Sequence, residues 1–371
     1  MEQQNEANAR SRSLTSQNGH CEAPFLCGLV LAGGEGKRLR SFIHLLRQDL
    51  LPKQYVNFIG RRSMLEHALG RAERLIPAER VFTIINRSHL EFPAVQRQIS
   101  GRRPDTVIIQ PENKETGPGI LLSLMHITRR YPNAIVALLP SDHFVLEEEP
   151  LMSHIRRAYL LVKRNPSQIM MLGIKPDHEE PEYGYILPGT KVAHNGKTDI
   201  HEIAGFVEKP ALNEARRLIG KGALWSTMMM VFAAGTLWRQ VRKIAPQLCN
   251  SFQTIYNAIG TSDEESIAQR TYDGLQPVNF SKELLEPIAR ERLADLRVLP
   301  VQDVTWSDWG SEVRVMEVLR KSGYASRLNG LMRAPLDRVL GIPGRTQSAQ
   351  GALSEELRSP AVGTTRDRAS L

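Results

Sequence analysis

Hydrophobic residues along the chain gather in short, nearly continuous runs, and longer stretches with helical periodicity separate these runs. Continuous apolar runs of this length are typical of strands buried on both faces of a sheet. We interpret residues 25–31, 81–85, 106–110, 134–139 and 169–173 as strands. Helical stretches between them include residues 64–75, 119–131 and 151–164. This alternation predicts an α/β fold with a doubly wound, mostly parallel sheet.

After residue 174 the pattern changes to shorter mixed segments at 203–208 and 225–232, followed by helical stretches at 237–259 and 312–321. We therefore expect residues 25–330 to form one α/β unit with substrate-binding insertions. Residues 1–24 and 331–371 are rich in Ser, Gln, Arg, Gly and Pro and show no sustained periodicity. Such composition predicts disordered tails.

Composition narrows the class of protein. Hydrophobic residues make up 41% and charged residues 24%, which are ordinary values for a soluble globular protein. Three cysteines without metal-ligand spacing fit a reducing compartment. The N-terminus lacks the apolar region of a signal peptide, and no apolar run approaches the roughly 20 residues of a membrane span. We expect a cytoplasmic protein that binds no membrane.

The formal net charge of +8 raises the question of nucleic acid. The basic residues form no run interleaved with aromatic residues, and an enzyme that acts on polyphosphates explains the charge equally well. We therefore expect no nucleic-acid partner.

The first predicted strand runs into LAGGEGKRLR at residues 31–40, a glycine-rich turn with basic residues. Glycines let backbone N–H groups approach phosphate oxygens, and α/β folds bind ligands at the C-terminal ends of strands. A P-loop would need Ser or Thr where Arg38 stands, and a dinucleotide fingerprint would need a third glycine where Leu39 stands. An NAD-dependent enzyme is therefore a weak alternative, and a solvated basic turn remains open for this segment taken alone.

A second basic residue, Lys53, follows in LPKQY. The pattern GxGxRL followed by PKQ resembles the signature of nucleotidyltransferases that make nucleoside-diphosphate sugars, and most closely the mannose-1-phosphate guanylyltransferases. The similarity covers roughly residues 25–325 and continues in order through QPENKETGPGI at 110–120, LLPSDH at 138–143, EYGYI at 182–186, FVEKP at 206–210 and WSDWG at 306–310.

Two aspartates are candidate metal ligands. Asp142 ends an apolar strand, and Asp308 lies between two tryptophans. Mg²⁺ is a hard cation that binds one or two carboxylates together with phosphate oxygens. Taken alone, Asp142 suits a turn and Asp308 an N-terminal helix cap equally well. The resemblance implies that both carboxylates hold Mg²⁺.

The sugar side is expected around EYGYI and FVEKP. Gly184 permits close approach of a sugar ring, although packing of the flanking tyrosines, including Tyr183, explains the segment as well. Glu208 and Lys209 end a strand-like run, where an exposed charge pair would look the same. The resemblance implies that Glu208 contacts the sugar and Lys209 the sugar phosphate. Ser226 stands where the family carries Asn after Trp.

The nucleotide side includes Gln110, whose amide offers a donor and an acceptor to a base edge, and Thr116-Gly117 close by. The resemblance of this stretch to guanylyl members favours GTP, although Lys114 replaces the family's arginine and Gly117 its alanine. We expect the nucleotide to contact Leu31, Ala32, Gly33, Gly34, Gly36, Lys37, Gln110, Thr116 and Gly117.

The implied reaction is attack by a sugar 1-phosphate, with mannose 1-phosphate favoured, on the α-phosphorus of GTP or another NTP. The nucleophile is already an anion, so the protein's task is positioning and charge neutralisation. Arg38 and Lys53 would neutralise phosphate charge, with Asp142 as the third catalytic residue. A non-catalytic, nucleotide-sugar-sensing protein on the same fold is the alternative, since residues 40–44 and Ser226 depart from the family pattern. A homo-oligomer is compatible with either.

Overall fold

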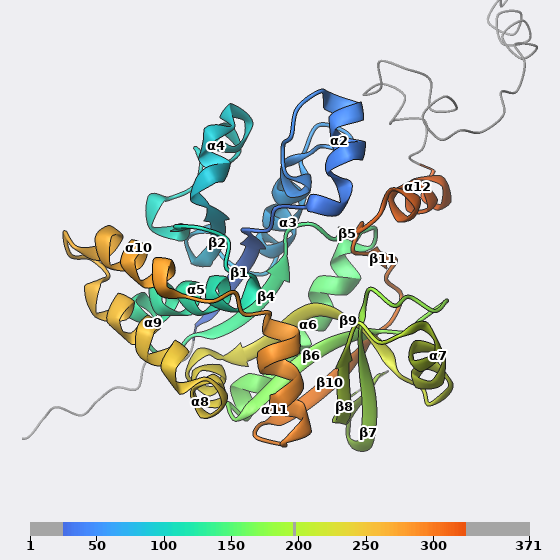
Figure 1. Cartoon of the computed structure of the whole chain (residues 1–371). Helices are drawn as coiled ribbons and strands as arrows, with labels where there is room; N and C mark the ends of the chain where they lie inside the picture. The colour runs from blue at the N-terminus through green and yellow to red at the C-terminus, as the bar shows by residue number, and fades with distance from the viewer. Residues whose placement is uncertain (1–24, 196–197, 324–371) are drawn as a thin grey trace, which may run out of the picture.

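The computed structural model describes residues 25–195 and 198–323 (Figure 1). The two predicted tails and the expected boundary at residue 330 lie outside the described residues. The main feature is a nine-stranded sheet in the order β3-β2-β1-β4-β9-β6-β10-β8-β7. Its strands are β1 (Leu26–Ala32), β2 (Val81–Asn86), β3 (Val107–Gln110), β4 (Ile135–Pro140), β6 (Gln168–Ile174), β7 (Gly184–Asn195), β8 (Thr198–Glu208), β9 (Leu224–Ala233) and β10 (Asp295–Val301).

The sheet is mixed, so the expected α/β class holds but a mostly parallel sheet is not confirmed. Strands β3, β2, β1 and β4 are parallel to their neighbours, and so are β6 and β10. Strand β9 separates the two groups and runs antiparallel to both β4 and β6. The β7–β8 hairpin adds further antiparallel pairs at one edge. A buried apolar run carries no mark of its direction, which is why the pattern missed β9's orientation.

Helices cover both faces of the sheet (Figure 1). Alternate side chains of β1 point to opposite faces: Val30 joins the core cluster under α3 (Met64–Glu73) and α6 (Glu148–Arg164), while Leu29 joins the cluster under α5 (Thr116–Arg130), α8 (Ala234–Ile244) and α9 (Pro246–Ala258). Both side chains are fully buried. The parallel part of the sheet therefore holds the residues at the C-terminal ends of its strands in fixed positions.

The predicted elements before residue 174 are confirmed, with ends shifted by a few residues. The helical stretch predicted at 237–259 is two helices, α8 and α9, because Pro246 has no N–H for a continuing helix and instead begins α9. The helix predicted at 312–321 is α12 (Glu312–Lys321), capped by the Ser311 hydroxyl. Further helices were not predicted: α2 (Arg40–Arg47), α4 (Pro93–Ile99), α7 (Leu212–Gly220), α10 (Glu264–Gly274) and α11 (Glu286–Arg290).

A second, two-stranded sheet pairs β5 (Phe144–Val145) with β11 (Trp306–Ser307). This pairing brings the segment after β4 against the segment before α12, although about 160 residues separate them in the chain. As a result the predicted metal ligands Asp142 and Asp308 come from neighbouring segments. Among the helices of the described residues, none is long and apolar enough to cross a membrane.

Candidate active site

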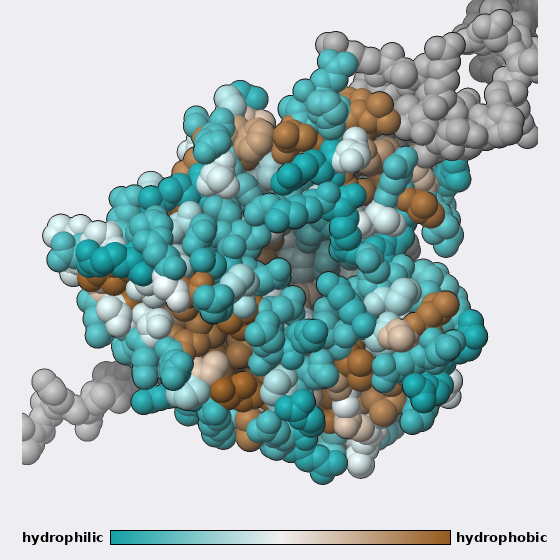
Figure 2. Space-filling view, in the orientation of Figure 1, coloured by the Kyte–Doolittle hydropathy of each residue, from teal (hydrophilic) through white to brown (hydrophobic). Residues whose placement is uncertain are grey.

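A cavity of about 360 Å³ opens at the C-terminal ends of β1 and β4, the position predicted for a ligand site. Figure 2 shows the surface hollowed, with mostly hydrophilic residues around it, between the part that carries α2 and the part that carries β7 and β8. Ten predicted residues line the cavity: Leu31, Gly33, Gly34, Gly36, Lys37, Arg38, Lys53, Gln110, Thr116 and Asp142. Ala32 and Gly117 are buried behind it.

Residues of the PKQY segment contact the glycine-rich loop and fix its backbone. Gln54 donates from its amide nitrogen to the carbonyls of Ala32 at 2.8 Å and Gly34 at 2.7 Å. Gly36 has a φ of 60°, and a Cβ there would lie 3.1 Å from the Lys53 backbone nitrogen. Both the left-handed backbone and the close approach explain why glycine stands at this position.

Lys53 joins the two aspartate segments. Its ammonium lies 2.9 Å from Asp142 Oδ2 and donates to the Asp308 carbonyl at 2.8 Å. Only 7% of the Lys53 side chain is exposed, whereas 33% of the Asp142 side chain opens to the cavity. Lys53 therefore neutralises Asp142 and fixes the backbone at Asp308, and its contact with a phosphate stays a prediction.

Asp142 remains an anion in this setting. Burial is the largest single influence and by itself would raise the pKa of Asp142, but the charge of Lys53, its hydrogen bond and the other neighbouring polar groups together outweigh burial and hold the pKa below its usual value. The neighbouring His143 is neutral, because burial lowers its pKa to about 4. The indole N–H of Trp306 donates to His143 Nδ1 at 3.2 Å, so the imidazole proton resides on Nε2, which lies 3.9 Å from Asp142 Oδ1.

Asp308 is the centre of a second polar network. Its Oδ1 accepts from the Tyr183 hydroxyl at 2.9 Å and from the Gly310 N–H at 2.9 Å, and it lies 3.3 Å from Arg314 Nε. Arg314 is buried, and its guanidinium also pairs with Glu180 at 2.8 Å. Asp308 therefore does not cap α12, and its carboxylate is held in one orientation from several directions.

Arg38, the residue expected to meet the triphosphate, lies half exposed at the cavity rim. It pairs with Glu182, and its Nη2 lies 3.7 Å from Asp308 Oδ2. Arg38 thus links the glycine-rich loop to the EYGYI segment.

The predicted sugar-side residues meet at the end of the β7–β8 hairpin. Gly184 is paired with Glu208 in register, and a Cβ at Gly184 would lie 2.7 Å from Glu208 Oε2 and 3.3 Å from Ser226 Cβ. Burial raises the pKa of Glu208, opposed by the neighbouring Lys209 charge. Lys209 is exposed, has a φ of 50° and donates its N–H to the Tyr183 carbonyl at 3.1 Å.

On the nucleotide side, Gln110 is buried against Gly33 and Gly119, and its Oε1 accepts no hydrogen bond within the described residues. An orphaned acceptor beside a cavity suits a donor on a bound base. Thr116 accepts from the Phe280 N–H at 3.0 Å. Gly117 donates its N–H to Val278 at 2.9 Å, so its lack of a side chain serves packing.

The two aspartates fit a hard cation. Asp142 Oδ1 faces His143 at 3.9 Å and Asp308 Oδ2 faces Arg38 at 3.7 Å, both too long for hydrogen bonds, so each carboxylate keeps an oxygen for a ligand. No cluster of three or more His, Cys, Asp or Glu side chains in the described part of the chain could hold a metal alone. Two carboxylates completed by phosphate oxygens match the preference of Mg²⁺.

Several residues of this arrangement were missed by pattern reasoning. Gln54 stands in the quoted PKQ motif, but only the fold shows that it supports the loop. Arg314 sits inside an amphipathic helix, where a basic residue normally faces solvent, and Glu180 precedes the quoted motif. The spacing of Trp306 and His143 in the chain carries no signal of their contact.

Comparison with known proteins identifies the family of this chain. Residues 27–321 match the family model described as nucleotidyl transferase, so the chain belongs to that family. Among curated relatives, the chain is 26% identical to the xanthan biosynthesis protein XanB of Xanthomonas campestris pv. campestris over 81% of its length. It is 28% identical to a mannose-1-phosphate guanylyltransferase of Escherichia coli over 82% of its length. The chain spans about three-fifths of each relative, 61% and 62% respectively.

Solved structures of other proteins share the fold of this chain. A Thermus thermophilus protein described as a mannose-1-phosphate geranyltransferase superimposes with a TM-score of 0.64 at 26% identity, over 77% of this chain and 76% of that one. A Helicobacter pylori protein described as a mannose-6-phosphate isomerase shares the fold, with a TM-score of 0.58 at 17% identity over 76% and 99%.

Proposed function

We propose that this protein transfers a nucleotidyl group from an NTP, GTP in the first instance, to a sugar 1-phosphate such as mannose 1-phosphate, with release of pyrophosphate. The observation that carries the proposal is the hydrogen bond from Tyr183 to Asp308. It connects the hairpin that bears Gly184 and Glu208 with the carboxylates beside the glycine-rich cavity. The names of the guanylyltransferase relatives support this substrate pair.

In this proposal the glycine-rich loop receives the triphosphate, and Arg38 exchanges its pair with Glu182 for phosphate oxygens. Glu208 and Lys209 bind the sugar and its phosphate, and the phosphate attacks without a general base because it is already charged. Asp142 and Asp308 would hold Mg²⁺, which when bound would supply further positive charge at the phosphates. Lys53 keeps both aspartates in place, and the orphaned Gln110 oxygen would accept from the base.

The test is pyrophosphate release measured over a panel of four NTPs and several sugar 1-phosphates, with and without Mg²⁺. The proposal predicts turnover with GTP and mannose 1-phosphate that requires Mg²⁺. Turnover with another pair would revise the substrates, while tight nucleotide-sugar binding with no turnover for any pair would favour the non-catalytic alternative. The carboxylates with one open oxygen each argue for catalysis, since binding alone does not need them.

A further inference from the structure

Trp306 contacts both side chains that stand next to the two predicted metal ligands. Its indole N–H donates to His143 Nδ1 at 3.2 Å, and the two rings meet edge-on with centroids 5.1 Å apart. Its ring also lies against Tyr183, with centroids 5.3 Å apart. His143 follows Asp142 in the chain, and the Tyr183 hydroxyl donates to Asp308 at 2.9 Å. Trp306 therefore connects the surroundings of one carboxylate with those of the other.

The backbone places Trp306 where these contacts can form. Strand β11 begins at Trp306 and pairs antiparallel with β5, so Trp306 lies opposite Val145. His143 directly precedes β5, and Asp308 directly follows β11. Each strand has only two residues, and a pairing this short gives little rigidity by itself. Side-chain contacts across the pairing therefore help to fix the separation of the two carboxylates.

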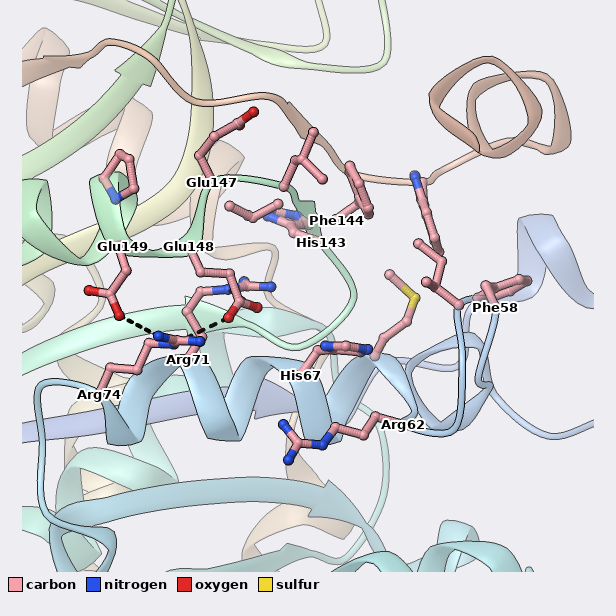
Figure 3. Close-up of a pocket in the computed structure, with 16 residues that line it drawn as sticks. Phe58, Arg62, His67, Arg71, Arg74, His143, Phe144, Glu147, Glu148 and Glu149 are labelled. Carbon is pink, nitrogen blue, oxygen red and sulfur yellow. Dashed lines mark hydrogen bonds and ion pairs between the residues drawn. The ribbon is translucent and has the colours of Figure 1, made fainter. Parts of the chain in front are cut away.

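Packing alone does not hold the His143 ring in place. His143 borders a cavity of about 600 Å³ between α3 and residues 143–150, and Figure 3 shows the imidazole beside Phe144 at the wall of this cavity. An imidazole next to a cavity has room to rotate about its side-chain bonds unless a hydrogen bond fixes it. Among the described residues, the hydrogen bond from Trp306 is the one that the His143 ring makes.

The direction of this hydrogen bond fixes the tautomer of His143. An indole N–H can only donate, so Nδ1 must offer a lone pair and the imidazole proton resides on Nε2. His143 Nε2 lies 3.9 Å from Asp142 Oδ1, while Lys53 holds Asp142 Oδ2 at 2.9 Å. The carboxylate oxygen that stays open for a cation thus faces an N–H group. The other tautomer would turn a lone pair toward that oxygen, and the two negative partial charges would repel each other.

We propose that Trp306 is a positioning residue for the two predicted metal ligands. Its N–H fixes His143 beside Asp142, and its ring supports Tyr183, whose hydroxyl holds Asp308. The separation of two carboxylates decides how well one cation binds to both, and Mg²⁺ demands near-ideal geometry. Loss of a group that orients metal ligands typically lowers metal affinity by about 10–100-fold. This inference rests on the proposed function, because it assumes that both carboxylates hold the metal.

Binding of Mn²⁺ to the full chain tests the inference without turnover. Mn²⁺ suits the same oxygen ligands as Mg²⁺, and electron paramagnetic resonance detects it directly. In Trp306→Phe, which keeps an aromatic ring and loses the N–H, the Kd for Mn²⁺ should rise about tenfold. Trp225→Phe is the matched control, since it removes an indole N–H that donates to Tyr185 at 3.1 Å; its Kd should equal that of the wild type. An unchanged Kd in Trp306→Phe, or an equal rise in the control, would overturn the inference.

Nitrogen NMR of the metal-free protein with labelled histidine supplies an independent measurement. The wild type should show His143 protonated on Nε2, with its resonances assigned by their loss in His143→Asn. The Nδ1 resonance should shift in Trp306→Phe and stay in place in Trp225→Phe. Protonation of His143 on Nδ1 in the wild type would contradict the inference. Thermal unfolding of Trp306→Phe should match the wild type, and a large fall of its midpoint would make Trp306 a structural residue instead.

Asp142→Asn separates a failure of this inference from a failure of the proposed function. The Kd for Mn²⁺ should rise in Asp142→Asn by more than in Trp306→Phe, because the variant loses the charge that binds the cation. An unchanged Kd in Asp142→Asn would refute the metal site of the proposed function, and the inference would fall with it. Weaker binding in Asp142→Asn together with an unchanged Kd in Trp306→Phe would refute the inference alone.

Discussion

The ammonium of Lys53 lies 2.9 Å from Asp142 Oδ2, and the lysine is nearly enclosed while the aspartate opens to the cavity. Asp142 thereby places a fixed negative charge at the C-terminal edge of the sheet, and the enclosed ammonium of Lys53 compensates that charge. A carboxylate held in this way can bind a cation in the cavity without first being desolvated or moved.

Replacing Lys53 should therefore cost stability. Lys53→Met removes the compensating charge and the hydrogen bonds to the Asp308 and Trp309 carbonyls, and we expect the free energy of unfolding to fall by about 2 kcal/mol. The measurement is urea denaturation at pH 7. Lys37→Met is the control: Lys37 is 72% exposed and, among the described residues, pairs with Glu35 alone, so its loss should change stability by less than about 0.5 kcal/mol. Equal effects of the two variants would contradict the structural role of Lys53.

Asp142→Asn should abolish catalysis and preserve the fold. The amide keeps the size of the side chain but removes the charge that would hold Mg²⁺, so pyrophosphate release should fall at least about 100-fold. Thermal unfolding with circular dichroism checks the fold. Asp177→Asn, at a site 68% exposed and paired with His178, should turn over like the wild type. Near-normal turnover by Asp142→Asn would refute the metal assignment.

Gly184→Ala should act on the sugar side alone. The added methyl would lie 2.7 Å from Glu208 Oε2 and must displace it, so the KM for the sugar 1-phosphate should rise about tenfold or more while the KM for the NTP stays unchanged. Gly205→Ala, on the same hairpin, is the control, because its methyl would contact only Leu187 at 4.0 Å. If the KM for the NTP rises instead, Glu208 does not belong to the sugar site.

The protein should lose stability in mild acid. His89 is buried with its Nδ1 2.9 Å from the Tyr55 hydroxyl, and burial lowers its pKa to about 4. An unfolded histidine has a pKa near 6.5, so below that pH the unfolded chain binds more protons and stability falls as the pH drops from about 6.5 to 4. His89 alone contributes roughly 2–3 kcal/mol of this loss between pH 7 and 4.5.

Urea denaturation across this pH range tests the assignment. As the pH falls, the free energy of unfolding of His89→Asn should decrease less steeply than that of the wild type. The exposed His44→Asn should follow the wild-type profile, and identical profiles for all three proteins would show that His89 is not responsible.

Local sequence was sufficient for several parts of this molecule. The buried runs at β1, β2, β4 and β6 identify strands because side chains covered on both faces must all be apolar. The end of β1 also marked the cavity, because glycines let backbone N–H groups approach a ligand at the C-terminal end of a strand, although this segment alone left a solvated basic turn open. In α2, Phe42, Ile43 and Leu46 form a buried face with helical spacing, although this helix was not predicted.

Other parts depend on pairings between distant segments. In the sequence, β9 is one more run of apolar residues. Only its hydrogen bonds with β4 and β6 reveal that it runs antiparallel to both and separates the two parallel groups of strands. The contacts of Arg314 with Asp308 and Glu180, and of Trp306 with His143, join residues that no periodicity relates.

By itself, the sequence determined the strands before residue 174, the helices that follow them and the types of residue in the glycine-rich turn after β1, because burial and backbone freedom are local demands. Tertiary structure decided which charges meet. It paired Lys53, which the sequence predicts to neutralise a phosphate, with Asp142. Electrostatic partners follow from proximity in space, and proximity across some 160 residues is set by the β5–β11 pairing and not by any pattern along the chain.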